Sequence, residues 1–299
     1  MSIGVVGLGK MGSAIVERLL ERGHKVNIWN RTPEKADRLV RMGAILERTP
    51  RGVAQAADTV ISMLTDPGAI EAVFCGRDGV LEANLSGRLV IDMSTVSADA
   101  ELRLAGLVQG RGAAFVECPV VGTVAPARTG QLIGLVGGSA EEVTRATPVL
   151  TDLCRRIEHV GPVGSGANMK LAINLPLIVF FQALGEAYSL VKHLDKSPEW
   201  VVQLLADTPG AAGILRMRGA VVAASLAGNL SEPAAFEVET ALKDLDLMLE
   251  EARRRSITLP LVAEVRSLYG QAVNDGWAHR DLSTFAAYWG RGENGSSTA

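Results

Sequence analysis

The hydrophobic positions of this 299-residue chain follow two different patterns, which change over at about residue 160. In the first part, short runs rich in Val, Ile and Leu alternate with stretches of helical periodicity. The expected strands are 3–7, 25–29, 44–46, 59–63, 89–92, 114–117, 132–136 and 156–160, and the expected helices are 13–21, 33–41, 51–57, 67–74, 98–109 and 140–153. Strands this short and apolar are typical of a sheet covered on both faces. The alternation therefore predicts a doubly wound, mainly parallel sheet of the α/β class.

Helical periodicity dominates after about residue 164, where strand patterns nearly disappear. The expected helices are 167–192, 198–205, 211–227, 234–255 and 260–274. We therefore expect an α/β domain over residues 1–163, an all-α domain over 164–290 and a disordered polar tail over 291–299. The first of these helices is long and apolar on several faces. We expect it to link the two domains and to pack against a partner subunit in a homodimer or homotetramer.

Composition and charge narrow the classes of function. A net charge of −3 and an aromatic content of 4% argue against a nucleic-acid surface. Three widely spaced cysteines form no disulfide framework, and the four histidines do not cluster with cysteines or carboxylates along the chain, so no metal site is expected. A strand pattern begins by the second or third residue and leaves no room for a signal peptide. The apolar run 171–184 is too short and too polar for a membrane span, so a cytoplasmic protein is expected.

A glycine-rich segment separates the first expected strand from the first expected helix. Its residues are Gly7, Leu8, Gly9, Lys10, Met11 and Gly12. Between a strand and a helix, the first glycine permits a tight turn, the second lets the backbone approach a pyrophosphate, and the third lets the helix pack closely on the strand. The anion then lies against the N–H groups at the start of the helix. This motif predicts a Rossmann domain that binds a dinucleotide.

The end of the second expected strand bears on which dinucleotide is bound. Rossmann domains that prefer NAD place an acidic residue there, about 20 residues after the glycines, to bind the ribose 2′-hydroxyl. Here the strand ends in Asn30, Arg31 and Thr32. Arg31 can pair with a 2′-phosphate through charge-assisted hydrogen bonds, and Asn30 and Thr32 can donate further ones. The sequence therefore predicts a preference for NADP(H) over NAD(H).

Four further segments carry a family resemblance. They are Asp92-Met93-Ser94-Thr95, Glu117-Cys118-Pro119-Val120-Val121-Gly122-Thr123, Gly164-Ser165-Gly166-Ala167-Asn168-Met169-Lys170 with Asn174, and Phe236 followed by Lys243-Asp244. Together with the two nucleotide motifs, in this order, the chain resembles the β-hydroxyacid dehydrogenases over roughly residues 2–290. This group includes 3-hydroxyisobutyrate dehydrogenase and glyoxylate/succinic semialdehyde reductase, and is similar to 6-phosphogluconate dehydrogenase.

The resemblance implies an active site in a cleft between the two domains and reversible hydride transfer between NADP(H) and a small β-hydroxy acid or its aldehyde counterpart. It implies that Lys170 is the catalytic acid/base and that Asn174 binds substrate beside it. The implied cofactor contacts outside the glycine loop and the second strand are Met63, Leu64, Thr65, Thr95 and Lys243. The other implied substrate contacts are Ser94, Val121, Gly122, Thr123 and Phe236.

The spacing of Lys170 and Asn174 supports these roles, because residues at i and i+4 lie one above the other on a helix. A partly desolvated lysine has a pKa lowered toward working pH, so it can give a proton to a carbonyl oxygen or take one from an alcohol. While protonated, it also stabilises negative charge that grows on that oxygen. The helix start at 164–166 adds N–H groups that favour an anionic substrate.

Two of the departures from the family pattern bear on the substrate. The substrate loop of the family reads close to DAPVSGG, whereas here it is ECPVVGT, so Val121 replaces the usual serine. Leu175 replaces an asparagine that often follows Asn174. A valine suits a less polar or bulkier substrate, which leaves the substrate open. An imine reductase of the same architecture and a non-catalytic NADP-binding sensor or scaffold are the alternatives, and the presence of Lys170 counts against both.

Overall fold

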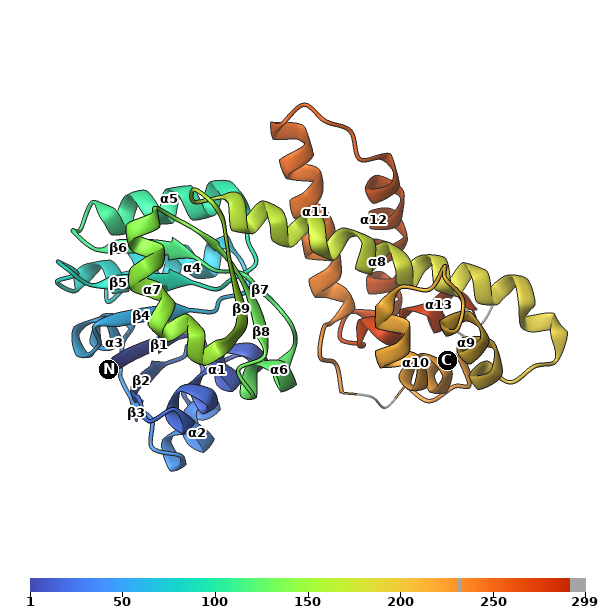
Figure 1. The fold of residues 1–299 in the computed structure, drawn as a ribbon, viewed down its shortest axis with the longest axis horizontal. Coiled ribbons are helices and arrows are strands. Elements are labelled where there is room, and N and C mark those ends of the chain that lie inside the picture. Colours follow the sequence, from blue (N-terminus) through green and yellow to red (C-terminus); the bar gives the residue numbers. More distant parts are fainter. Residues whose placement is uncertain (231–232, 291–299) are drawn as a thin grey trace. The chain divides into compact units, whose positions relative to one another are not determined.

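The computed structural model describes residues 1–230 and 233–290, so the expected disordered tail 291–299 lies outside the described residues. The chain divides into two compact units, Met1–Lys170 and Leu171–Ala299. Residues 164–170, which we assigned to the second domain, belong to the first unit by this division, and they open the long helix that continues into the second unit (Figure 1).

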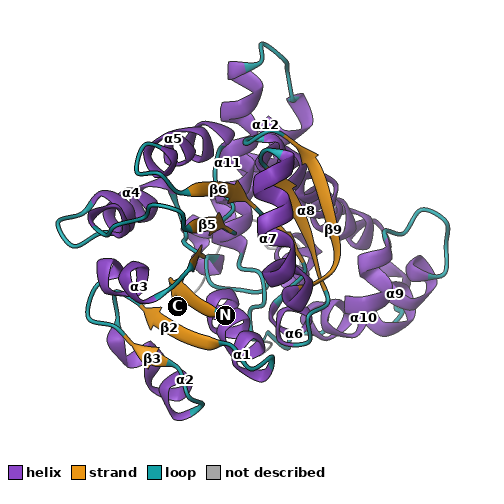
Figure 2. Ribbon diagram, turned by 60° about the vertical axis from the view of Figure 1, so that its left-hand side comes forward, coloured by secondary structure: helices purple, strands orange, loops and turns teal. Residues whose placement is uncertain are grey.

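The first unit is built on one sheet with the strand order β3-β2-β1-β4-β5-β6-β8-β7, and β9 pairs with β8 (Figure 2). The strands are β1 Ser2–Val6, β2 Lys25–Trp29, β3 Ile45–Leu46, β4 Thr59–Ser62, β5 Leu89–Asp92, β6 Ala114–Glu117, β7 Val120–Val121, β8 Leu132–Gly137 and β9 Cys154–Gly161. All pairs from β3 to β6 are parallel, whereas β8 runs antiparallel to β6 and β7. The expected mainly parallel, doubly wound sheet is confirmed.

The helices of this unit cover both faces of the sheet. They are α1 Lys10–Glu21, α2 Asp37–Arg41, α3 Pro50–Ala56, α4 Pro67–Cys75, α5 Ala98–Gln109, α6 Val124–Arg128 and α7 Ala140–Leu153, with short 3-10 turns η1 Pro33–Ala36 and η2 Val80–Glu82. Alternate residues of the central strands β1, β4, β5 and β6 enter opposite cores. Val5 of β1 packs in the core that also contains Ile15 and Leu150, whereas Val6 packs in the core that contains Phe74 and Leu104. This double burial explains why these central strands are apolar over most of their length.

Side-chain caps define where several of the helices begin. The side chains of Ser97 and Ser139 accept hydrogen bonds from the first turns of α5 and α7, and both helices have the bounds expected from the sequence. The expected helix 33–41 begins differently: the Thr32 side chain makes no capping hydrogen bond, and Pro33 begins a 3-10 turn rather than an α-helix. The short elements β7 and α6 were not predicted, since neither is long enough to show a period.

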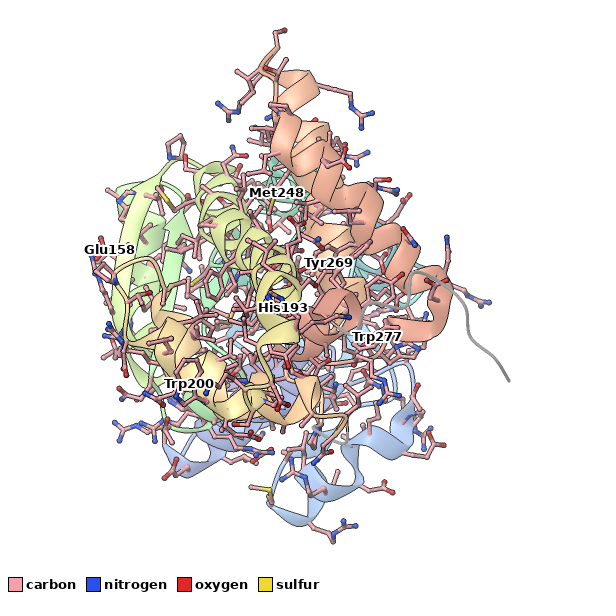
Figure 3. All side chains as sticks on the ribbon, turned by 90° about the vertical axis from the view of Figure 1, so that its right-hand side faces the viewer. Glu158, His193, Trp200, Met248, Tyr269 and Trp277 are labelled. Atoms are coloured by element: carbon pink, nitrogen blue, oxygen red, sulfur yellow. The ribbon has the colours of Figure 1, made fainter. Side chains whose placement is uncertain are left out.

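The second unit is helical in its described residues, apart from a single bridge between Glu237 and Asp281. Its helices are α8 Ser165–Val191, which begins in the first unit, α9 Pro198–Ala206, α10 Gly213–Leu226, α11 Val238–Arg254, α12 Pro260–Ala272 and α13 Phe285–Gly290, with η3 Lys192–Leu194, the π-helical turn η4 Val273–Trp277 and η5 Leu282–Thr284. Tyr269 lies at the centre of this unit (Figure 3), where its ring stacks on Phe285 at 3.8 Å and its hydroxyl donates to the Ile178 carbonyl at 3.0 Å.

The segment Ser165–Leu194 is long and apolar enough to cross a membrane by length and composition alone, although core helices of globular proteins pass the same test. Its residues Leu171, Ile178 and Phe181 pack in the core of the second unit. This packing favours the expected reading of α8 as a core helix.

Candidate cofactor and catalytic site

The glycine-rich loop fits a dinucleotide phosphate in its geometry. Gly7 follows β1 with a φ of +98°, and a Cβ there would lie 2.4 Å from the Met63 carbonyl oxygen. A Cβ on Gly12 would lie 1.9 Å from the Gly7 carbonyl oxygen, so the helix could not pack this closely with any side chain. Gly9 is exposed, and a Cβ there would meet no atom within 4 Å. The loop is therefore packed tightly against the protein at Gly7 and Gly12, and it is open to solvent at Gly9, at the start of α1. Pyrophosphate binding requires this arrangement.

Asn30 ties the loop after β2 to the glycine-rich loop. Its Oδ1 accepts a hydrogen bond from the Leu8 N–H at 2.9 Å, and its Nδ2 donates to the Thr32 carbonyl at 2.9 Å. Arg31 and Thr32 are exposed. The side chain of Asn30 thus holds the two loops together, and Arg31 is presented at the carboxyl edge of the sheet, beside the glycine-rich loop.

The loops after β4 and β5 are joined by one buried serine. Ser94 Oγ accepts a hydrogen bond from the Leu64 N–H at 2.9 Å and donates to Asp92 Oδ1 at 2.8 Å. Ser62 Oγ also donates to Asp92 Oδ1, at 2.5 Å. Ser94 is 1% exposed, so its hydroxyl positions the Met63–Thr65 loop rather than facing solvent in this structure. Thr95, the next residue, is only partly buried.

Three buried carboxyl groups lie at or near the ends of β5 and β6. Sequence reasoning quoted Asp92 and Glu117 in the family motifs without giving them a role, and it missed Glu101. Asp92 and Glu117 end β5 and β6 and are direct partners in the strand register. Glu101, on α5, is fully buried, and neither of its carboxyl oxygens has a hydrogen-bond partner among the described residues. Burial raises the pKa of Asp92, and burial together with the Asp92 charge raises the pKa of Glu101 well above its usual value. Burial and the neighbouring Asp92 charge therefore both favour the protonated form of Glu101.

The loop that corresponds to the expected substrate loop lies between β6 and α6. Val121 is partly buried and pairs with Ile133 of β8. Gly122 has a φ of +134°, and a Cβ there would lie 2.7 Å from Leu132 Cδ2, so the turn needs glycine. Thr123 is exposed and precedes α6.

Helix α8 carries both expected catalytic residues. Lys170 is partly buried, and Asn174, one turn further along, is buried. In the second unit, Asn174 Nδ2 donates to Asp244 Oδ2 at 2.7 Å, and Lys243 Nζ lies 3.4 Å from Asp244 Oδ1. The expected residues Asn174 and Lys243 are thus brought together by Asp244. Sequence reasoning quoted Asp244 in the motif and gave it no role, because its partner is 70 residues away in the chain.

Phe236 is held near the start of α11 by a buried carboxylate. The Asp281 carboxylate accepts hydrogen bonds from the N–H groups of Ala235 at 2.7 Å and Ser283 at 2.9 Å, and pairs with the Arg218 guanidinium at 3.0 Å. Burial opposes ionisation, yet these partners hold the pKa of Asp281 below its usual value. Phe236 itself packs against the core of the second unit and is partly buried.

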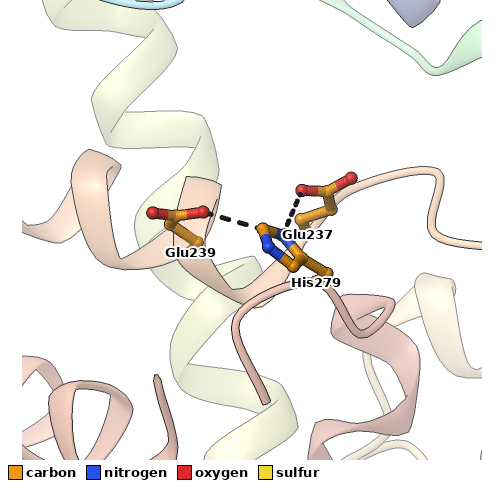
Figure 4. A group of neighbouring side chains, drawn as sticks. All are labelled: Glu237, Glu239 and His279. Atoms are coloured by element: carbon orange, nitrogen blue, oxygen red, sulfur yellow. Dashed lines mark hydrogen bonds and ion pairs between the residues drawn. The ribbon is translucent and has the colours of Figure 1, made fainter. Parts of the chain in front are cut away.

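The histidines do not cluster with carboxylates along the chain, but the fold brings His24 Nε2 to 2.7 Å from Asp152 Oδ2 and places His279 beside two carboxylates. His279 Nδ1 lies 3.4 Å from Glu237 Oε2 and 3.8 Å from Glu239 Oε2 (Figure 4). The three residues are separated along the chain and meet because Glu237 forms a bridge with Asp281. The ligand atoms are close enough together to hold a cation, but the His279 side chain is 82% exposed, and exposed groups of this kind are common without one.

Comparison with known proteins covers nearly the whole chain. The NAD binding domain of 6-phosphogluconate dehydrogenase matches residues 2–161, and the NAD-binding domain of NADP-dependent 3-hydroxyisobutyrate dehydrogenase matches residues 164–289. Glyoxylate/succinic semialdehyde reductase 1 of Arabidopsis thaliana is 33% identical over 283 residues, which cover 95% of this chain and 96% of the relative. 3-Sulfolactaldehyde reductase of Escherichia coli (strain K12) is 33% identical over 282 residues, which cover 94% and 93%.

A solved structure agrees with the fold of the chain. The Mycobacterium tuberculosis 3-hydroxyisobutyrate dehydrogenase, solved with L-serine, has a TM-score of 0.84 and 26% sequence identity. The alignment covers 96% of this chain and 98% of that one. The resemblance seen in the motifs therefore extends over both units.

Proposed function

This chain belongs to the β-hydroxyacid dehydrogenase family, and we propose that it reduces a small aldehyde that carries a carboxylate or another acidic group, or oxidises the matching hydroxy acid, with NADP(H). It is a pyridine-nucleotide-dependent oxidoreductase by its family domains and its relatives. The nicotinamide supplies or takes up the hydride when it is bound. The preference for NADP(H), the class of substrate and the role of each residue are our proposals.

The observation that carries the proposal is that Lys170 and Asn174 lie one turn apart on α8. In reduction, Lys170 Nζ donates a proton to the carbonyl oxygen as negative charge grows there, and in oxidation it accepts the proton from the hydroxyl. Asn174 is buried, and its side-chain amide donates a hydrogen bond to Asp244. The amide therefore cannot rotate without losing this hydrogen bond. A fixed amide is suited to orienting a substrate for the lysine.

The experiment that tests the substrate class is a steady-state assay of NADPH oxidation. We propose glyoxylate, succinic semialdehyde and 3-sulfolactaldehyde as candidates, because relatives are named for them. We expect at least one of these aldehydes to be reduced at a higher kcat/KM than any cyclic imine. Turnover of the imine alone would favour the imine reductase alternative, and NADPH binding without turnover of any carbonyl compound would favour the sensor.

We propose that Arg31 reads the 2′-phosphate of NADP(H). No acidic residue stands beside it in the segment Asn30-Arg31-Thr32, and its side chain is exposed after β2. Replacing Arg31 with Ala should raise KM for NADPH about tenfold and change KM for NADH less than twofold, since one charge-assisted bond to phosphate is worth roughly 1.5–3 kcal/mol. Arg41→Ala, which removes an exposed arginine of α2, serves as the control. Equal effects of Arg31→Ala on the two cofactors would contradict this role.

We also propose a homodimer or homotetramer in the cytoplasm. Leu190 is 76% exposed and Leu194 is 50% exposed at the end of the α8 segment, and apolar side chains of this size are typical of subunit interfaces when they gather on one surface. Sedimentation analysis measures the assembly directly.

A further inference from the structure

We propose that Glu117 is a positioning residue: its buried carboxylate caps the first turn of α8 and thereby sets the position of Lys170. The inference rests on the proposed function, because it gives Glu117 a role through the acid/base lysine. Glu117 itself touches neither substrate nor cofactor in this account.

The contacts of the Glu117 carboxylate are with the backbone of α8. Its Oε1 accepts a hydrogen bond from the Gly166 N–H at 2.8 Å, and its Oε2 accepts one from the Ala167 N–H at 3.3 Å. These are the second and third residues of α8, whose N–H groups have no partner within the helix. Glu117 therefore acts as an N-cap supplied by a strand 49 residues earlier in the chain.

The residue before α8 cannot supply this cap itself. Gly164 has no side chain and adopts a φ of +94°, a conformation that side chains rarely adopt. The neighbouring N–H groups are bonded within the segment, from Ser165 to the Pro162 carbonyl at 3.0 Å and from Asn168 to the Gly164 carbonyl at 3.2 Å. The N–H groups of Gly166 and Ala167 are thus the two that need an acceptor, and Glu117 provides both oxygens.

The space around the carboxylate is shaped to fit it. A Cβ on Gly137 of β8 would lie 2.1 Å from Glu117 Oε1. A Cβ on Gly166 would lie 2.3 Å from the Leu135 carbonyl oxygen and 3.2 Å from Glu117 Oε1. Two glycines on different elements are therefore needed for Glu117 to reach the helix. This interlock fixes the start of α8 against the end of β6.

Lys170 follows this capped turn directly. In an α-helix the N–H of each residue pairs with the carbonyl four residues earlier, so Lys170 is tied to Gly166, one of the two capped residues. A small displacement of the first turn is therefore passed to Lys170. Such misplacement of a catalytic group can cost about 100-fold in rate.

The charge of Glu117 is sensitive to pH near neutrality. Burial raises its pKa to about 7, although the hydrogen bonds from Gly166 and Ala167 favour the charged form. The other titratable groups near it are Asp92 on β5, whose charge disfavours its ionisation, Glu101 on α5, whose own pKa is raised partly by the Glu117 charge, and the buried thiol of Cys118. Above about pH 7 the carboxylate accepts both N–H groups, and below it the neutral acid caps the helix less well.

The test is a double-mutant cycle of Glu117→Gln and Lys170→Ala, measured as kcat and as KM for NADPH. Gln has the shape of Glu but places an NH₂ group against an N–H donor, so the variant should fold and lose half of the cap. We expect Glu117→Gln to lower kcat at pH 8 about tenfold and to leave KM for NADPH unchanged. In the Lys170→Ala background, the same change should have less than a twofold effect. The exposed Glu141→Gln serves as the control, because it removes a carboxylate that caps nothing in α8.

Two further readouts separate positioning from a general loss of stability. Hydrogen exchange of the amides in 166–170 should become faster in Glu117→Gln, whereas exchange in α5 stays the same. The ratio of wild-type kcat to that of Glu117→Gln should shrink from pH 8 to pH 6, because wild-type Glu117 is then protonated and resembles the amide.

The outcomes are distinguishable. A wild-type kcat in Glu117→Gln, unchanged exchange at 166–170, or a full additional loss in the Lys170→Ala background would each overturn the positioning role. Wild-type activity in the Lys170→Ala single variant would instead overturn the proposed function, and exchange at 166–170 would still decide whether Glu117 caps the helix.

Discussion

Replacement of Lys170 by alanine should lower kcat at least about 100-fold, because it removes the group that exchanges a proton with the substrate oxygen. NADPH affinity should stay nearly unchanged, since the glycine-rich loop and the 30–32 segment lie on other elements of the first unit. Steady-state kinetics with the best aldehyde of the panel give kcat, and quenching of protein fluorescence gives the Kd for NADPH. A loss of kcat with an unchanged Kd is the signature of a group that acts in the chemical step.

Lys196→Ala is the matched control for this experiment. Lys196 is exposed, with its Nζ 5.5 Å from the ring centroid of Trp200, and it has no place in the proposed site. Its variant should keep wild-type kcat and KM. If Lys170→Ala turned over like the wild type, another group would have to supply the proton and the assignment of α8 as the catalytic helix would be wrong.

Replacement of Gly9 by alanine should raise the Kd for NADPH at least about tenfold without lowering the melting temperature. Gly9 has a φ of −69°, which any residue adopts, and an added Cβ would meet no protein atom within 4 Å. The methyl group therefore costs the protein no packing. It would occupy the space in which the backbone approaches a pyrophosphate, so only nucleotide binding should suffer.

Alanine variants of two other glycines are the controls for this experiment. Gly106→Ala, on α5, also adds a methyl group in open space and should leave the Kd unchanged, with a slightly higher melting temperature from the helix propensity of alanine. Gly12→Ala should lower the melting temperature, because its Cβ would lie 1.9 Å from the Gly7 carbonyl oxygen. Unchanged NADPH binding in Gly9→Ala would mean that the phosphates lie elsewhere.

Local sequence patterns predicted the helices and strands well where residues next to an element in the chain determine where it begins and ends. The bounds of β5, β6, α5 and α7 were predicted to the residue, because strong apolar runs or capping serines define them. The 3-10 turn after Thr32 could not be predicted, since its sequence has the same proline and acidic residues as the start of an α-helix. The two-residue strand β7 has no period to detect.

The candidate site likewise contains a part that local sequence predicts and a part that depends on long-range contacts. The glycine-rich loop is a local motif, and its expected packing at Gly7 and Gly12 is confirmed by the geometry. The contacts that position the expected site residues are long-range: Asp244 binds Asn174 across 70 residues, and Glu117 binds Gly166 across 49. Spacing along the chain contains no signal for such contacts. A polar residue at the end of an apolar strand, as at Glu117, is the one hint that sequence offered.

The central claim is that this protein moves a hydride between a nicotinamide and the carbonyl carbon of a small aldehyde, and isotope transfer tests it most directly. NADPH deuterated at both C4 positions is incubated with the wild-type protein and, in separate reactions, with each aldehyde of the panel or with the cyclic imine, and the products are examined by mass spectrometry. The account predicts a hydroxy acid one mass unit heavier than the unlabelled product, with the deuterium on the carbinol carbon. Deuterium recovered only in an amine, or in no product at all, would contradict it.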